Sequence, residues 1–158
     1  MNKYDKVMID TAVSFSTLST CDRLNVGAVI SKDGRPLATG YNGTISGTTN
    51  DCEEVCPVCN GQSFENDIQE GCERCGQSGK VTSDTTVHAE QNAIFYAAKN
   101  GIALDGTTMY VTHNPCKQCA KAIASAGIKR VVYKEFYRDS EGSDFLTKCG
   151  VDVEEFFI

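Results

Sequence analysis

The sequence contains no tryptophan, only three prolines and only two histidines among 158 residues. Its apolar stretches are short: segments such as 120–127 and 128–133 fall far below the roughly 20 residues that span a membrane. Lysine and arginine never occur in a run longer than two, and the net charge is −6. Hydrophobic residues make up 41% and charged residues 23%. This composition excludes disordered, fibrous and membrane-spanning proteins, and it argues against a nucleic-acid partner, which is bound through many Lys and Arg contacts to phosphate.

The chain length suits one domain, which we expect to cover residues 1–158, because a domain of this size removes roughly 70% of its unfolded surface from water. Residues 1–10 mix charged and apolar side chains and do not contain the apolar core of a secretion signal. We therefore expect a cytoplasmic protein. Cysteine is nevertheless abundant, with nine residues. Since disulfides rarely persist in a reducing cytosol, these cysteines are interpreted first as metal ligands or nucleophiles.

Apolar periodicity predicts the order of helices and strands. Spacings of three and four predict an amphipathic helix in the first twenty residues, with an apolar side made of Tyr4, Val7, Met8, Ala12, Phe15 and Leu18. Two apolar runs predict a β-hairpin of residues 26–30 and 36–41. The later pattern predicts helices at 88–100, 116–126 and 144–149, and strands at 107–113, 129–136 and 151–154. A strand, a helix and a strand in succession form a parallel βαβ unit, so the fold class is α/β with a mixed sheet of about five strands.

Two short motifs each open a predicted helix: H-A-E at residues 88–90 and P-C-K-Q-C at residues 115–119. Together they supply three zinc ligands, His88, Cys116 and Cys119, and leave a fourth position for water, which is typical of a catalytic zinc site. The helix dipole favours thiolates at such positions. Glu90 is interpreted as the group that accepts and returns the proton of the water. Either motif alone has a simpler explanation, a chance H-x-E or a thioredoxin-like redox dithiol.

Residues 44–85 form a polar, cysteine-rich insert without apolar periodicity. A loop of this length inside a compact domain needs something other than a hydrophobic core to order it. The insert contains two C-x-x-C pairs whose spacing is typical of a closed structural zinc site, formed by Cys56, Cys59, Cys72 and Cys75. Disulfides and free thiols are the alternatives for these four residues. Cys149, on a terminal apolar segment, is expected in the core.

Four blocks of the sequence, residues 19–30, 39–47, 88–101 and 109–133, resemble consecutive blocks of the deoxycytidylate (dCMP) deaminase family, especially its phage-encoded members. The order H-x-E and then P-C-x-x-C is the signature of zinc nucleobase deaminases. The resemblance implies a single deaminase domain with a cytidine-deaminase-like three-layer fold, in which helices flank the sheet. It also implies zinc-dependent hydrolysis of dCMP to dUMP and ammonia, in which the four motif residues keep the roles given above. The dUMP would supply thymidylate synthesis, in the host cytoplasm if the protein is phage-encoded.

Cys21 and Cys52 resemble positions that some phage members use, together with two histidines, to hold a second zinc. The only histidines of this chain are His88 and His113, so that histidine pair is missing. Cys21 and Cys52 are therefore alternative ligands for the insert zinc, or buried thiols. We favour the four insert cysteines as the ligands.

The G-Y-N-G segment of residues 40–43 resembles a nucleotide-binding motif of the family. Its glycines permit close backbone approach, and Asn42 can hydrogen-bond the sugar or the base. A simple turn that closes the hairpin is the alternative. For the 5′-phosphate we expect Arg23, Tyr137 and Arg138, because arginine binds phosphate well, although any one surface arginine can also be just a solvated charge.

The resemblance further implies a homohexamer that is activated by dCTP with Mg²⁺ and inhibited by dTTP. The two effectors would compete for one site built around Gly40, Tyr41, Asn42 and Gly43. Lys117 and Lys121 are candidate ligands for the triphosphate, and an unregulated enzyme is the alternative. Other candidate functions are a zinc deaminase for another nucleoside, a tRNA adenosine or a riboflavin-pathway pyrimidine, and a zinc-binding module without catalysis. Glu90 argues against the last, because a structural zinc site has no use for such a carboxylate.

Overall fold

The computed structural model describes residues 2–61, 72–76 and 78–157, so residues 62–71 and 77 of the expected insert, and positions 1 and 158 of the expected domain, lie outside the described residues. A mixed sheet has the strand order β2-β1-β5-β6-β7. Its strands are β1 (Gly27–Lys32), β2 (Arg35–Tyr41), β5 (Thr108–His113), β6 (Arg130–Glu135) and β7 (Asp152–Glu155). β1 pairs antiparallel with β2 and β5, whereas β5, β6 and β7 are parallel. The expected α/β class and mixed five-stranded sheet are confirmed.

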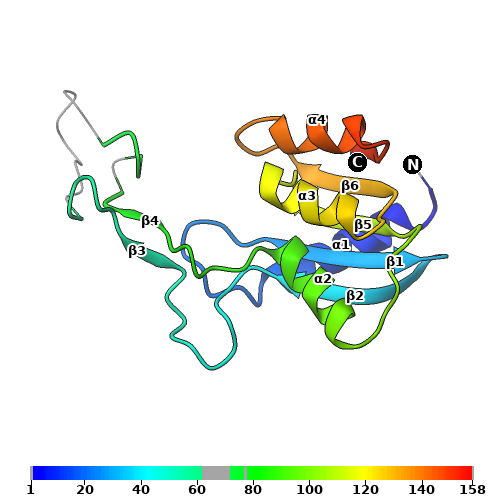
Figure 1. Cartoon of the computed structure of the whole chain (residues 1–158), viewed down its shortest axis with the longest axis horizontal. Coiled ribbons are helices and arrows are strands. Elements are labelled where there is room, and N and C mark those ends of the chain that lie inside the picture. The colour runs from blue at the N-terminus through cyan, green and yellow to red at the C-terminus, as the bar shows by residue number, and fades with distance from the viewer. Residues whose placement is uncertain (1, 62–71, 77, 158) are drawn as a thin grey trace.

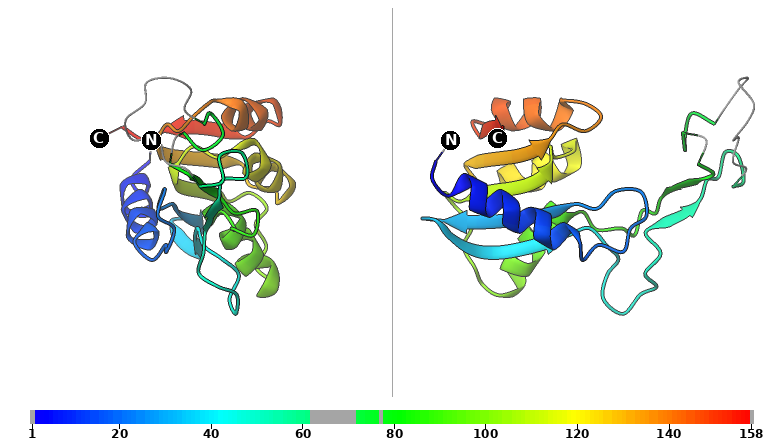
Figure 2. Two further views of the ribbon diagram at one scale, coloured as in Figure 1. Left: turned by 90° about the vertical axis from the view of Figure 1, so that its left-hand side faces the viewer. Right: turned by 180° about the vertical axis from the view of Figure 1, so that it is seen from behind.

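Helices cover both faces of this sheet (Figure 2). One face carries α1 (Asp5–Ser16), and the other carries α2 (Ala89–Lys99), α3 (Lys117–Ser125) and α4 (Glu141–Lys148). The central strands are therefore apolar on both sides. Ile30 and Val111 belong to the core that includes α2 and α3, whereas their neighbours Val29 and Tyr110 belong to the core under α1. This arrangement is the expected three-layer fold.

Of the predicted apolar side of helix α1, Met8 and Ala12 are buried as expected, but other members of that side are not. The buried residues are Asp5, Met8, Ile9 and Ala12. Three residues of the predicted apolar side, Tyr4, Val7 and Leu18, are exposed to solvent. The cause is the carboxylate of Asp5, which accepts hydrogen bonds from both terminal nitrogens of Arg130 (2.8 and 2.9 Å) and from the hydroxyl of Tyr110 (2.9 Å). The predicted helix is confirmed, but its predicted orientation was wrong at these exposed positions, because an ion pair with the sheet fixes its first turn.

The insert leaves the sheet as a two-stranded hairpin, β3 (Glu53–Val55) and β4 (Lys80–Thr82), which projects away from the rest of the molecule (Figure 1). Sequence periodicity predicts no strand here, because each strand has only three residues. Val81 of β4 packs in a small cluster with four cysteines of the insert, Cys56, Cys59, Cys72 and Cys75. Cysteines thus make up most of the buried cluster of this hairpin, in place of the larger apolar side chains of an ordinary core.

Cys149 is exposed, so the expectation that it lies in the core was wrong. It is the residue that directly follows α4, and the helix buries Leu146 instead. Among the described parts of the chain, none of the helices has both the length and the apolar character of a membrane span.

Candidate active site

The candidate active site lies where α2 and α3 begin. His88 directly precedes α2, and Cys116 directly precedes α3; both have extended backbone angles. The two helices pack against each other, which brings the positive ends of their dipoles close together. This location favours the thiolate form of cysteine.

His88, Cys116 and Cys119 lie together, as the two motifs predict. The Nδ1 atom of His88 lies 3.7 Å from Sγ of Cys116 and 3.4 Å from Sγ of Cys119, and all three donor atoms lie within 4.8 Å of one another. Zinc bonds of about 2.3 Å to sulfur and about 2.05 Å to nitrogen place tetrahedral sulfur and nitrogen ligands about 3.6 Å apart. The donor set and its spacing therefore fit one zinc ion with three protein ligands.

Hydrogen bonds among the three donor groups shift their pKa values. Hydrogen bonding with Cys119, and then with His88, outweighs burial and lowers the pKa of Cys116 to about 3. The hydrogen bond with Cys116 raises the pKa of His88. The same partner, together with burial, raises the pKa of Cys119. A divalent cation would allow both thiols to ionise at this separation, because metal coordination deprotonates thiols.

Glu90 lies in the first turn of α2 and has only 4% of its surface exposed. Burial raises the pKa of its carboxyl group, which lies close enough to His88, Cys116 and Cys119 to interact with each of them. A buried carboxyl group with a raised pKa binds a proton more readily than an exposed one. The site therefore places a buried carboxyl group next to the three potential metal ligands.

A cavity of about 250 Å³ extends over this cluster. The residues that the sequence analysis assigned to substrate contacts all line it: Arg23, Asn42, Tyr137 and Arg138. It is also lined by residues that the sequence analysis did not identify as part of the site, including Glu53, Thr82, His113 and Asn114. One cavity is thus bordered by two of the potential metal ligands, His88 and Cys116, by the buried Glu90 and by two arginines.

Asn42 holds one wall of this cavity in place. Its Oδ1 atom accepts a hydrogen bond from the backbone N–H of Val26 (2.7 Å), and its Nδ2 atom donates one to the carbonyl of Leu24 (2.7 Å). Leu24 and Val26 both line the cavity. The side chain of Asn42 therefore shapes the cavity, and one N–H of its amide remains for a ligand.

The other residues of the G-Y-N-G segment differ in their surroundings. A Cβ atom on Gly40 would lie only 2.3 Å from the carbonyl oxygen of Ala89, so glycine at this position allows α2 to pack closely on β2. A Cβ atom on Gly43 would meet nothing within 4 Å. Tyr41 is partly exposed. This packing role of Gly40 was not expected from the sequence.

Tyr137 and Arg138 are held at the cavity by Asn114. The side-chain oxygen of Asn114 accepts a hydrogen bond from the backbone N–H of Tyr137, and its Nδ2 atom donates one to the carbonyl of Asp139 (2.8 Å). The guanidinium carbon of Arg138 lies 4.9 Å from the centre of the Tyr137 ring, and the ring of His113 meets that ring edge-on at 5.9 Å. A sequence signal for Asn114 existed, since it stands between a predicted strand and the P-C-x-x-C motif.

The insert contains a second candidate metal site. The Sγ atoms of Cys56 and Cys72 are 3.7 Å apart, as are those of Cys59 and Cys75, and all four sulfur atoms lie within 4.8 Å of one another. Tetrahedral zinc–thiolate bonds of about 2.3 Å would place sulfur atoms about 3.8 Å apart. The geometry therefore fits a closed site of four thiolates.

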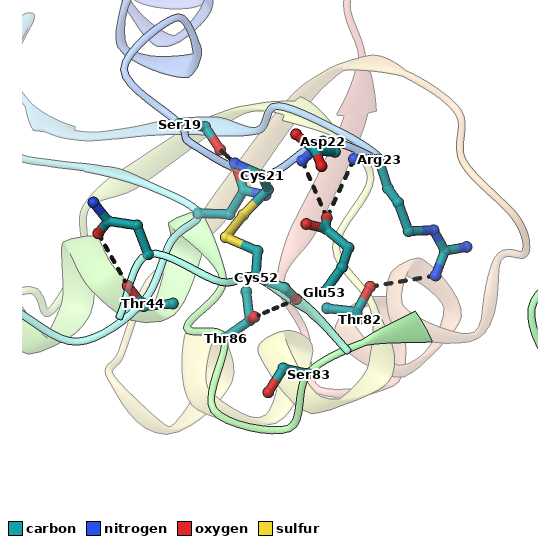
Figure 3. The surroundings of a disulfide bond; sticks show 12 residues. Ser19, Cys21, Asp22, Arg23, Thr44, Cys52, Glu53, Thr82, Ser83 and Thr86 are labelled. Carbon is teal, nitrogen blue, oxygen red and sulfur yellow. Dashed lines mark hydrogen bonds between the residues drawn. A yellow bond between two sulfur atoms is a disulfide. The ribbon is translucent and has the colours of Figure 1, made fainter. Parts of the chain in front are cut away.

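Cys21 and Cys52 form a disulfide with each other (Figure 3). Both are buried. The expectation that they are alternative zinc ligands or buried thiols was therefore wrong, because the fold brings their two sulfur atoms together. The disulfide joins the segment before β1 to the base of the insert.

Lys117 and Lys121 both lie on α3 and are exposed. Lys117 forms an ion pair with Glu141 of α4 (3.5 Å). Neither lysine belongs to the lining of the cavity described above.

The fold and the site define a class of protein. A three-layer α/β domain that presents one histidine, two cysteines and a buried glutamate at two helix N-termini has the arrangement of a zinc-dependent nucleobase deaminase. The family model of the cytidine and deoxycytidylate deaminase zinc-binding region matches residues 2–135. The chain belongs to this family, which confirms the resemblance noted in the sequence.

Several relatives resemble the chain over most of its length. The deoxycytidylate deaminase of Enterobacteria phage T4 is 36% identical over an alignment 166 residues long, gaps included, that covers 92% of this chain and 86% of the phage protein. ComE operon protein 2 of Bacillus subtilis (strain 168) is 41% identical over 138 residues, which cover 87% of this chain but only 62% of the B. subtilis protein. Among solved structures, the dCMP deaminase from cyanophage S-TIM5 in complex with dCMP and dUMP has a TM-score of 0.78 and 37% identity, over 99% of both chains.

Proposed function

We propose that this protein catalyses the hydrolytic deamination of dCMP to dUMP and ammonia. The observation that carries the proposal is that the buried Glu90, two arginines and two of the three potential zinc ligands, His88 and Cys116, border one cavity, with Cys119 grouped beside these two ligands. The names of the phage T4 and cyanophage relatives, and the dCMP and dUMP in the cyanophage structure, support the choice of substrate.

In this reaction a water oxygen replaces the amino group at C4 of the cytosine ring. A zinc ion held by His88, Cys116 and Cys119 would supply the Lewis-acid activation of that water. Glu90 accepts one proton as the water oxygen bonds to C4 and delivers it to ring N3; it then takes the second proton from the new C4 hydroxyl group and passes it to the amine, which leaves as ammonia while C4=O forms. Burial favours the protonated form of Glu90, because it raises the pKa of the carboxyl group above its usual range.

We assign Arg23, Tyr137 and Arg138 to the 5′-phosphate of the substrate. A phosphate monoester carries a charge of about −1.5 to −2 at neutral pH. Two guanidinium groups on one cavity can offset that charge, and each can form paired hydrogen bonds with phosphate oxygens. Asn42 contributes by holding the wall at 24–26 and by offering its remaining amide N–H to the sugar or the base.

We also propose that Cys56, Cys59, Cys72 and Cys75 hold a second, structural zinc. The described part of the insert has little apolar material to bury, and Val81 is the single aliphatic residue in the cysteine cluster. A closed metal site would supply the folding free energy that this segment cannot obtain from a core.

Regulation is the last part of the proposal and follows from the resemblance to phage enzymes. A homohexamer would be activated by dCTP with Mg²⁺ and inhibited by dTTP at residues 40–43, with Lys117 and Lys121 near the triphosphate. The dUMP would feed thymidylate synthesis in the cytoplasm, which is the host cytoplasm if the protein is phage-encoded. An effector shifts an equilibrium only if it binds the two states with different affinity, so dCMP kinetics should change from sigmoidal to hyperbolic with dCTP and Mg²⁺. Initial rates that neither triphosphate changes would contradict regulation but not deamination.

The substrate is tested by measuring ammonia release from dCMP, cytidine, deoxycytidine and dCTP side by side, with zinc-loaded protein. We expect dCMP to have the highest kcat/KM. The variant Glu90→Gln, purified in the same way, controls for contaminating deaminases. Zinc-loaded protein that releases no ammonia from dCMP would contradict the proposed function.

A further inference from the structure

The insert contributes to the candidate catalytic cavity as well as to the second candidate metal site. Glu53 is the first residue of β3, and Thr82 is the last residue of β4; both line the cavity, as does Arg23. The base of the hairpin therefore reaches the cavity, while its cysteine cluster lies toward the projecting end (Figure 1).

Two residues of this hairpin base bind Arg23 (Figure 3). The Oε1 atom of Glu53 accepts hydrogen bonds from the backbone N–H groups of Asp22 (3.1 Å) and Arg23 (3.2 Å). The Nη1 atom of Arg23 donates a hydrogen bond to Oγ1 of Thr82 (3.4 Å). The same hairpin thus holds both the backbone and the guanidinium group of Arg23, and this uses only one of the five guanidinium N–H donors.

Further links join the same two segments. The disulfide connects Cys21, two residues before Arg23, to Cys52, which directly precedes Glu53. Lys80 of β4 forms an ion pair with Asp22 (3.9 Å). The carboxylate of Glu53 is therefore held beside the backbone of Asp22 and Arg23 by connections on both sides.

We propose that Glu53 is a positioning residue, which fixes Arg23 and thereby sets the preference of the cavity for a phosphorylated substrate. Arg23 is exposed and lies outside the helices and strands, so a free side chain and loop would lose conformational entropy on binding phosphate. Bonds that hold the loop before binding reduce that loss. The inference rests on the proposed function, in which Arg23 contacts the phosphate.

A carboxylate in this cavity has a second possible effect, because its charge repels a phosphate. The two effects differ in the variant Glu53→Gln, which keeps an oxygen acceptor for the two N–H groups and removes the charge. If Glu53 acts by positioning, the KM for dCMP of Glu53→Gln should stay within about threefold of the wild-type value. If repulsion dominates, that KM should fall below this range, and the inference would be overturned.

The main test is a double-mutant cycle on dCMP turnover with Arg23→Ala, Glu53→Ala and the double variant. We expect Arg23→Ala to lower kcat/KM about 30-fold, as loss of a charge-assisted phosphate contact does. Glu53→Ala should raise KM about tenfold with kcat unchanged, and it should have less than a twofold effect once Arg23 is already alanine. The matched control is Glu54→Ala: Glu54 is the next residue on β3, is exposed and points to the opposite face, so its kinetics should equal those of wild type.

Three other outcomes would each overturn the inference. If the effects of Arg23→Ala and Glu53→Ala multiply in the double variant, Glu53 does not act through Arg23, and the inference is overturned. A fall in kcat for Glu53→Ala at unchanged KM would also overturn it, because that result would indicate damage to the catalytic cluster. If wild-type protein does not deaminate dCMP, the proposed function fails, and the inference fails with it.

Discussion

The substitution Gly40→Ala tests how tightly the site depends on the packing of α2 against β2. A Cβ atom at this position would lie 2.3 Å from the carbonyl oxygen of Ala89 and 2.6 Å from the backbone nitrogen of Ala93. Both contacts are with helix backbone, which cannot turn aside as a flexible side chain can. The helix must therefore move, and it carries His88 and Glu90 at its beginning.

The size of the effect follows from these distances. Ordinary contacts between non-bonded atoms lie near 3.5 Å, so α2 has to shift by about 1 Å. A misplacement of about 1 Å in catalytic groups can lower the rate about 100-fold. Overpacking of this kind also destabilises a fold by about 1–3 kcal/mol, which corresponds to roughly 3–10 °C in the melting temperature for a chain of this size.

The matched control is Gly43→Ala in the same G-Y-N-G segment, because a Cβ atom there meets nothing within 4 Å. Thermal unfolding and kcat at saturating dCMP without effectors should be measured for both variants, with zinc content determined for each. We expect Gly43→Ala to match wild type within about 0.5 kcal/mol in stability. Wild-type stability and activity in Gly40→Ala, or equal damage in both variants, would refute the packing argument.

Four further predictions concern the carboxylates and the insert cysteines. Glu90→Gln should keep its zinc and lower kcat about 10³- to 10⁴-fold, because Glu90 serves several proton transfers; near-normal activity in a zinc-loaded variant would contradict the mechanism. Cys59→Ser should lower the zinc content from two ions per chain to one and leave the catalytic ion bound, and a single zinc in wild type would reject the insert site. Asp5→Asn should lower the free energy of unfolding in urea by about 2 kcal/mol, because Arg130 loses one of its two charged partners and keeps Glu154; an unchanged midpoint would refute this role. Despite burial, hydrogen bonding with Arg130 and with the backbone of Asn2 lowers the pKa of Asp5 to about 2, and Arg130 also lowers that of Glu154 to about 2. The stability that these groups contribute should therefore be complete above about pH 4 and be lost as the pH falls through 2, and a flat profile over that range would contradict it.

The sequence alone predicted the candidate catalytic cluster and the order of the main elements. His88 and Glu90 are two residues apart, and Cys116 and Cys119 are three apart, so local helix geometry already limits how each pair can point. The alanines of α2 at 89, 93 and 97 repeat every four residues and are all buried, as an apolar helix face predicts. Patterns of this kind depend on neighbours along the chain, and the sequence displays those neighbours directly.

The tertiary structure alone decided which distant residues complete the cavity. Glu53 and Thr82 bind Arg23 across 30 and 59 residues, and Asp5 binds Arg130 across 125, with no periodicity that relates the partners. The pairing of Cys21 with Cys52 could not be foreseen either, because cysteine spacing does not specify which sulfur atoms meet. Gly40 looked like a ligand-binding glycine until the position of α2 showed the backbone against it. Contacts of this kind depend on how the segments pack in space, and packing is a property of the whole folded chain.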